Sequence, residues 1–137
     1  MSSAAWDLQQ AVHAALSADT SVLALLGTAR VYDHVPQGAA FPYLALASFI
    51  ARDWATGTEP GTEIIFTVNA WSRGVGHKQA HLLADAVRAA LHDAPLTLAA
   101  HHLVNLRHES SETHRERDGD TYRISIRFRA VLEPIAS

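Results

Sequence analysis

The stretch Thr62–Asp93, TEIIFTVNAWSRGVGHKQAHLLADAVRAALHD, contains two different hydrophobic periods in succession. Ile64 and Phe66 belong to an alternation of apolar and polar residues, which is typical of a half-buried strand. After an expected turn at residues 71–74, apolar residues recur at three- and four-residue steps, which predicts an amphipathic helix over Lys78–Leu91. We expect this helix to pack on the apolar side of the strand and to form the nucleus of the fold.

Length and composition favour one folded domain over residues 1–137. A chain of 137 residues is long enough to bury roughly two thirds of its unfolded surface in one core. Hydrophobic residues make up 48% of the chain and charged residues 18%, which is typical of a globular protein rather than a disordered one. The chain has no cysteine, which excludes thiol catalysis, disulfides and cysteine-zinc sites.

Charge and hydropathy limit the partners and the cellular location that we expect for the chain. The formal net charge is -3 without a basic cluster, so the chain lacks the electrostatic pattern of a nucleic-acid-binding protein. The N-terminal residues contain no positive segment followed by an apolar run, and no stretch approaches the ~20 apolar residues of a membrane span. We therefore expect a cytosolic protein with no export signal and no membrane contact.

The N-terminal part of the chain predicts two helices. Ser3 can cap a first helix that ends near Ser17. Asp19 or Thr20 can cap a shorter second helix, and Gly27 suits the left-handed conformation at its C-terminal end. Together the two helices resemble a helical hairpin.

Two strands follow these helices. A brief strand over residues 30–33 leads into a loop over 34–42, whose prolines forbid regular structure. A longer strand over 43–54 is apolar on both faces, so it is either central or covered on both sides, and a polar loop follows over 55–61. Strict alternation puts Leu44, Leu46 and Ile50 on one face and Tyr43, Ala45, Ala47 and Phe49 on the other.

The C-terminal third predicts a β-hairpin. Residues 120–133 show the cleanest two-residue alternation of the chain, and residues 101–114 are the expected partner strand. The far half of the hairpin, residues 108–123, is too polar to lie in a core. We therefore predict that this half projects from the domain as an arm.

The loop of this hairpin sets its register. A two-residue loop would place charged side chains on the buried face of the hairpin. A three-residue loop over 117–119, with its glycine in the left-handed conformation, keeps them off that face. The three-residue loop places Leu106 opposite Ala130. It also places Val104 opposite Leu132.

The order of predicted elements is helix, helix, three strands, helix and two strands. This order predicts an α+β fold, namely a mainly antiparallel sheet with helices on one face.

Candidate chemical sites are few. His77 and His81 share a helix face at four-residue spacing, but a zincin would need a glutamate after the first histidine, and Lys78 stands there. No Gly-x-Ser-x-Gly elbow and no phosphate-binding glycine loop are present. We expect no catalytic residue, no cofactor and no metal, and a structural protein. The alternative is a small oligomeric α+β enzyme that binds a ligand or metal through His77 and His81.

Two surface features favour contact with partners. The predicted arm mixes opposite charges densely, which suits an intersubunit rim, and its alternative is a solvated hairpin kept soluble by charge. Prolines stiffen the loop over 35–42, and stiff loops lose less entropy when they dock; Trp54 nearby is either core or contact. The candidate interface residues are Pro36, Gln37, Gly38, Trp54, Glu109, Glu112, Arg115, Glu116, Arg117, Asp118 and Arg123.

Short motifs in a fixed order run along nearly the whole chain, and their combination is similar to a known family. The motifs are Val31-Tyr32-Asp33, Pro36-Gln37-Gly38-Ala39, Phe41-Pro42-Tyr43, Trp54, Trp71-Ser72-Arg73, Leu103-Val104-Asn105-Leu106 and Arg127-Phe128-Arg129. With these motifs, the sequence resembles the tail-completion or tail-terminator proteins of long-tailed phages and gene transfer agents, most of all the gene-transfer-agent branch.

The resemblance implies a fold similar to that of the λ tail terminator and a ring of six subunits. Such a ring caps the tail tube at the head-proximal end of the tail, stops tube polymerisation and offers its other face to the head-side connector, or stopper, protein. The particle would be assembled in the bacterial cytoplasm. DNA would pass through the lumen without specific binding, which agrees with a chain that is not strongly basic.

Overall fold

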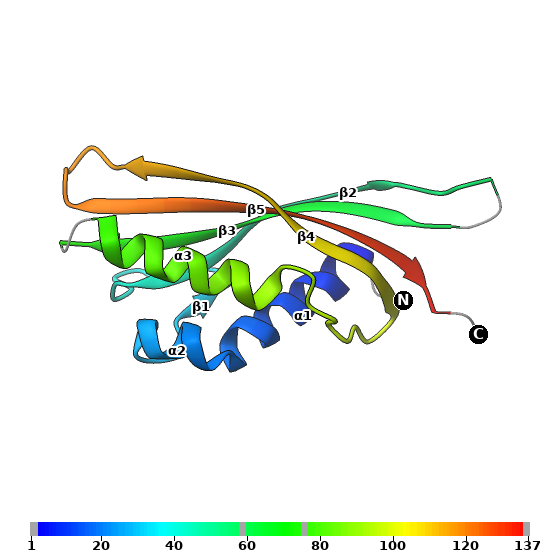
Figure 1. Ribbon diagram of the computed structural model, residues 1–137, viewed down its shortest axis with the longest axis horizontal. Helices are drawn as coiled ribbons and strands as arrows, with labels where there is room; N and C mark the ends of the chain where they lie inside the picture. The colour runs from blue at the N-terminus through cyan, green and yellow to red at the C-terminus, as the bar shows by residue number, and fades with distance from the viewer. Residues whose placement is uncertain (1–2, 58–59, 75–76, 136–137) are drawn as a thin grey trace.

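The chain forms one sheet with helices against one of its faces. The computed structural model describes residues 3–57, 60–74 and 77–135. Figure 1 shows the helices on the same side of the strands, so the opposite side of the sheet is left uncovered. In chain order the elements are α1 (Ala4–Ala18), α2 (Thr20–Leu26), β1 (Val31–Tyr32), β2 (Tyr43–Asp53), β3 (Thr62–Arg73), α3 (His77–Leu91), β4 (His101–Arg115) and β5 (Thr121–Pro134).

The strands lie in the order β1-β2-β3-β5-β4. β1 pairs with β2 in parallel, and every other neighbouring pair is antiparallel. β3 and β5 pair continuously, from Thr62 opposite Leu132 to Arg73 opposite Thr121. The predicted α+β class, with a mainly antiparallel sheet and helices on one face, is confirmed.

The helix-covered side of β3 and β5 forms the core. Phe66 and Phe128 are fully buried, and their rings stack with centroids 5.3 Å apart. Leu83 and Val87 of α3 are also fully buried, and α3 packs on both strands. Burying each of these side chains contributes roughly 1.5–3 kcal/mol. The strand and helix of residues 62–93 are therefore the packing nucleus that their periodicity predicts.

β3 is longer than expected. Residues 71–74 were predicted as a turn, whereas Trp71–Arg73 continue the strand and pair with residues 121–123 of β5. Tyr43 of β2 lies opposite Trp71 on the other side. β5 pairs with all three residues and β2 also pairs with Trp71, and local periodicity does not reveal these partners.

A bulge in β2 reverses the expected faces of two residues. The register shifts between Ala47 and Ile50, and Ser48 has a positive φ of 56°. Phe49 therefore stacks on Phe66 in the core, with ring centroids 4.9 Å apart. Ile50 lies opposite Ile65 on the uncovered side and is 63% exposed, so the prediction that grouped it with Leu44 and Leu46 is wrong. Residues 58–59 of the expected polar loop lie outside the described residues.

The loop of the β4–β5 hairpin differs by one residue from the prediction. The backbone N–H of Glu116 donates to the carbonyl of Thr121 at 2.8 Å, so the loop comprises the four residues 117–120. Gly119 has the predicted left-handed conformation, with a φ of 77°. A β-bulge at Glu109 restores the register that the extra loop residue would otherwise shift.

The predicted pairing holds only in the middle of the hairpin. Leu106 lies opposite Ala130, as predicted. A second bulge falls at Val104, so Leu103 lies opposite Leu132 and Val104 is 49% exposed. The prediction for Val104 is wrong because strict alternation does not allow for a bulge.

The predicted projecting arm, residues 108–123, is also wrong at its C-terminal end, where β5 begins. Thr121 and Tyr122 are buried, and β5 pairs with β3 on one side and β4 on the other. The physical reason is the extension of β3 to Arg73, which gives β5 a partner as far as its first residue. The polar half of β4 is the sheet edge, and beyond it only the turn is outside the strands.

The helix ends follow the predicted capping. The Ser3 hydroxyl accepts the backbone N–H of Trp6 at 3.1 Å, and the Asp19 carboxylate accepts that of Val22 at 3.0 Å. Gly27 ends α2 with a φ of 84°. Within the described residues, no helix is both long and apolar enough to span a membrane.

Candidate interaction surface

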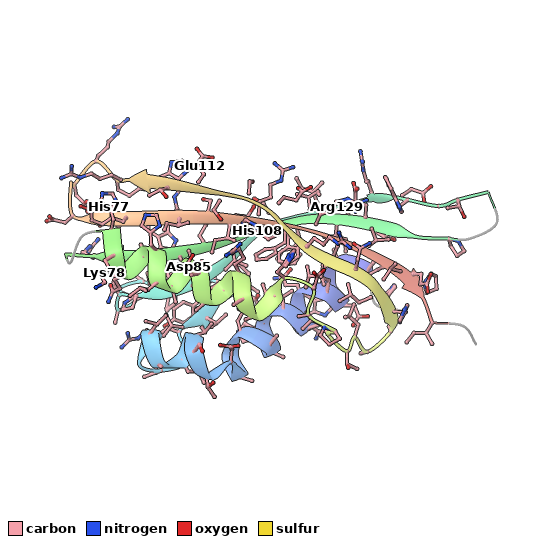
Figure 2. All side chains as sticks on the ribbon, in the orientation of Figure 1. His77, Lys78, Asp85, His108, Glu112 and Arg129 are labelled. Atoms are coloured by element: carbon pink, nitrogen blue, oxygen red, sulfur yellow. The ribbon has the colours of Figure 1, made fainter. Side chains whose placement is uncertain are left out.

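The side of the sheet away from the helices is the candidate functional surface, and we call it the open face. In Figure 2, His77, Lys78 and Asp85 lie along α3, whereas Glu112 and Arg129 belong to the strands above it. Cross-strand pairs share a face, so the register defines its members. They are Tyr32, Tyr43, Ala45, Ala47, Ile50, Arg52, Glu63, Ile65, Thr67, Asn69, Trp71, Arg73, His102, Asn105, Arg107, Ser110, Glu112, His114, Thr121, Arg123, Ser125, Arg127, Arg129, Val131 and Glu133.

An arginine–glutamate–arginine cluster lies on the open face. The Glu63 side chain is 5% exposed, and Arg129 Nε donates to its Oε2 at 2.6 Å while Arg52 Nε donates to its Oε1. The hydrogen bonds from Arg129 outweigh burial and, with those from Arg52, hold the pKa of Glu63 below its ordinary value. The sequence around Glu63 gives no sign that two arginines flank it, because Arg52 and Arg129 belong to other strands.

Trp54 extends this cluster. The Cζ atoms of Arg129 and Arg52 lie 4.9 and 5.7 Å from the centroid of the indole ring, and Trp54 remains 44% exposed. Of the two readings that the sequence left open for Trp54, the structure therefore shows a surface residue.

A hollow of about 340 Å³ adjoins these side chains, and we call it the charged hollow. Ile50 and Ile65 give it apolar surface. Its remaining lining carries three guanidinium groups and two carboxylates, so one positive charge is not balanced within it. These five residues are Arg52, Arg127, Arg129, Glu63 and Glu109.

An aromatic group occupies another part of the open face, near β1. The ring of Tyr43 lies 5.8 Å from Tyr32, 5.1 Å from Phe41 and 6.1 Å from Trp71, measured between centroids. The Arg73 guanidinium lies 4.2 Å from the Phe41 ring centroid. These contacts anchor one end of the loop over 34–42 and leave Pro36, Gln37 and Gly38 exposed.

The turn at residues 116–120 is tightly held by Asp118. Its Oδ1 accepts the backbone N–H groups of Asp120 and Thr121, both at 2.9 Å, and its Oδ2 accepts the Thr121 hydroxyl at 2.7 Å. The hydroxyl bond first, and then the backbone bonds, lower the pKa of Asp118. Arg115 Nε also donates to the carbonyl of Gly119 at 3.1 Å. The turn is therefore ordered by its own hydrogen bonds.

The candidate interface residues fall in three separate places. One is the exposed tip of the loop at Pro36–Gly38, the second is Trp54, and the third is the β4–β5 edge and turn. Within the third place, two ion pairs form inside the chain, Glu116 with Arg123 at 3.3 Å and Glu109 with Arg127 at 3.4 Å. The carboxylate of Glu112 also lies 3.3 Å from Nε2 of His114.

The histidine pair of α3 has a packing role. The ring of His77 lies 4.2 Å from that of Tyr122 and 6.3 Å from that of His81, measured between centroids. Over residues 3–57, 60–74 and 77–135, no three His, Cys, Asp or Glu side chains are grouped to hold a metal ion.

Asp7 is a buried carboxylate in the first turn of α1 that was not among the candidate residues. Its carboxylate is 2% exposed and accepts the backbone N–H groups of Ala99 and Ala100 at 3.1 and 2.9 Å, and it lies 2.8 Å from His101 Nδ1. Burial raises the pKa of Asp7, but these hydrogen bonds outweigh burial and lower it. Asp7 therefore fastens α1 to the start of β4.

The chain is therefore an α+β protein in which helices cover one face of the sheet and leave the other uncovered. The chain belongs to the tail completion protein gp17 family, whose model matches residues 10–133. It is therefore a structural protein of a phage-like tail, and the suspected family is confirmed.

Two solved structures are similar to this chain. A chain from the virion of a native gene transfer agent particle is 34% identical, with a TM-score of 0.88 over 97% of this chain and 99% of that one. A second solved chain, 18% identical with a TM-score of 0.57, covers 94% of this chain and 98% of its own length, and it shows the fold alone. No curated protein matches the sequence.

Proposed function

We propose that the chain is a ring subunit that caps the tail tube of a phage-like particle. The observation that carries the proposal is the match to the tail completion family over residues 10–133. The likeness over 97% of the chain to a protein of a gene transfer agent virion supports the same reading. In this function the ring stops tube polymerisation and forms the docking face for the head-side connector.

The surface supports such a role. A ring subunit between tube and connector needs surfaces for two neighbours in the ring and for a partner on each side. The open face, which includes the outward side chains of the β4 edge, and the exposed loop tip at Pro36–Gly38 offer surfaces for such contacts. We propose a ring of six subunits at the head-proximal end of the tail, assembled in the bacterial cytoplasm.

The ring would also form part of the DNA passage. A net charge of -3 suits a lumen through which DNA moves without being held, because phosphate binding requires clustered Lys and Arg. No specific contact with DNA is proposed.

Polymerisation of purified tail-tube subunits tests the proposal. With the chain present, electron microscopy should show six-fold rings on tube ends, and the mean tube length should fall as the chain concentration rises. Tubes that grow to the same length with and without the chain would refute the capping function.

A further inference from the structure

The two surfaces that we bring together lie on different parts of the sheet. Figure 2 labels Arg129, which lines the charged hollow, partway along the strands, and Figure 1 shows the β4–β5 turn at one extreme of the molecule. We infer that the turn of one copy, residues 116–120, seats in the charged hollow of a second copy. This contact rests on the proposed function, because it names the surface through which ring subunits would join.

The charged hollow suits a carboxylate. Its three guanidinium groups face two carboxylates, which leaves one positive charge unbalanced. Each guanidinium has five N–H donors in a planar fork that matches carboxylate geometry, so Arg52 and Arg129 can bind Glu63 and a further acidic group. Exposed apolar surface on Ile50 and Trp54 borders these cations and can be buried by the same contact.

The turn suits the hollow in charge and in rigidity. Residues 116–120 contain three carboxylates and one arginine, which gives the turn a formal charge opposite to that of the hollow. The internal hydrogen bonds of Asp118 already fix the turn, so docking costs little conformational entropy. Asp120 is exposed, and among the described residues its side chain is paired with no cation, so its carboxylate is the group that we place in the hollow.

One chain cannot make this contact with itself. Arg129 of the hollow and Thr121 beside the turn are eight positions apart on β5, roughly 26 Å at ~3.3 Å per residue. The turn therefore reaches a hollow only on another copy. Because two different surfaces meet, the contact runs head to tail, and repeated head-to-tail contacts generate a closed ring or an open filament.

Cysteine cross-linking tests the contact cleanly, because the chain has no cysteine of its own. Ala55→Cys lies beside Trp54, and Arg117→Cys lies in the turn; both positions are exposed. Mild oxidation of the double variant should give a ladder of covalent species larger than dimers on a non-reducing gel, and each single variant should give dimers at most. A double variant that forms no species beyond dimers overturns the contact.

A charge reversal provides the second measurement. In the double-cysteine background, Asp120→Arg should reduce the yield of multimers by about tenfold, because it places a cation against the arginines of the hollow. Asp85→Arg is the matched control, since Asp85 is an exposed carboxylate on α3, and it should leave the ladder unchanged. An undiminished ladder from Asp120→Arg, or an equal loss from both variants, contradicts the assignment of the carboxylate.

The two proposals fail separately. Multimers that form through this contact but leave tube growth unchanged refute the capping function alone. Wild-type capping of tubes together with the absence of a ladder refutes the contact alone.

Discussion

Replacing Asp7 with alanine should destabilise the protein more than any surface substitution on α1. The Asp7 carboxylate is 2% exposed and holds three groups at the start of β4: the N–H groups of Ala99 and Ala100 and the ring of His101. Asp7→Ala removes the acceptor of all three and leaves a void beside them. The connection between α1 and β4 is then lost.

The expected loss of stability in Asp7→Ala follows from the number of hydrogen bonds removed and from how far water can reach their donors. Loss of a bond to a charged acceptor costs about 1–3 kcal/mol, with the upper values for donors that no water can reach. Ala99 and Ala100 are exposed residues, so water can partly replace the lost acceptor, and the low end of the range applies. About 1 kcal/mol for each bond predicts a loss of about 3 kcal/mol in the free energy of unfolding.

Urea denaturation at pH 7 measures this loss. With a slope of about 2 kcal/mol per molar urea, the midpoint should fall by about 1.5 M. Gln10→Ala, an exposed change on the same helix, is the control and should shift the free energy of unfolding by less than about 0.5 kcal/mol. A shift for Asp7→Ala as small as that of the control would refute the reasoning.

The same carboxylate contributes to acid sensitivity. The pKa of Asp7 is lower in the folded chain than its ordinary value of 3.8, so its stabilisation is present above that value and is lost as the pH falls toward the folded pKa. Asp7→Asn should therefore lose less stability than the wild type between pH 6 and pH 3. Equal losses in the two proteins would contradict this sign.

Three further predictions concern the open face, the turn and the core. Glu63→Gln should make the urea midpoint fall less than in the wild type when the pH is lowered. The pKa of folded Glu63 lies below 4.5, so the stabilisation by its carboxylate is lost as the pH falls from 4.5 toward the folded pKa. Gly119→Ala should lower stability by about 1 kcal/mol in the same assay, because its φ is 77°, whereas Gly57→Ala, with open space around it, should have little effect. Phe66→Ala should cost about 3–5 kcal/mol in thermal unfolding, and Leu82→Ala, 45% exposed on α3, should cost far less; similar losses would contradict the assigned core.

The local sequence pattern predicted those structural features that depend on residues close together in the chain. The cap at Ser3, the left-handed Gly27 and the helix over residues 77–91 all depend on hydrogen bonds or apolar faces within a few residues. Each was predicted correctly, apart from one or two residues at the ends.

The bulges were not predicted because the register of a strand depends on its pairing partner as well as on its own sequence. At Ser48, the backbone φ of 56° moves Phe49 onto Phe66 and Ile50 to the open face. At Glu109, a bulge compensates for a loop that is one residue longer than expected. Alternation along one strand contains no information on where its partner forces such a shift.

Surface features also divide into those that the local sequence predicts and those that it does not. The exposed charges of the turn and the surface position of Pro36–Gly38 agree with their polar or proline-rich sequence. Glu63 was missed because its partner Arg129 is 66 positions away, and Asp7 was missed because its partners are 92 to 94 positions away.

Hydrophobic period and short motifs are properties of neighbouring residues, so the kinds of elements, their order, the α+β class and the resemblance to tail completion proteins could be read from the sequence. Strand adjacency, the uncovered face of the sheet and the charges that meet on it became known from the folded chain. Those features depend on pairing between distant segments. The arginines around Glu63 and the turn fixed by Asp118 exist as surfaces only after β3, β5 and their neighbours have aligned.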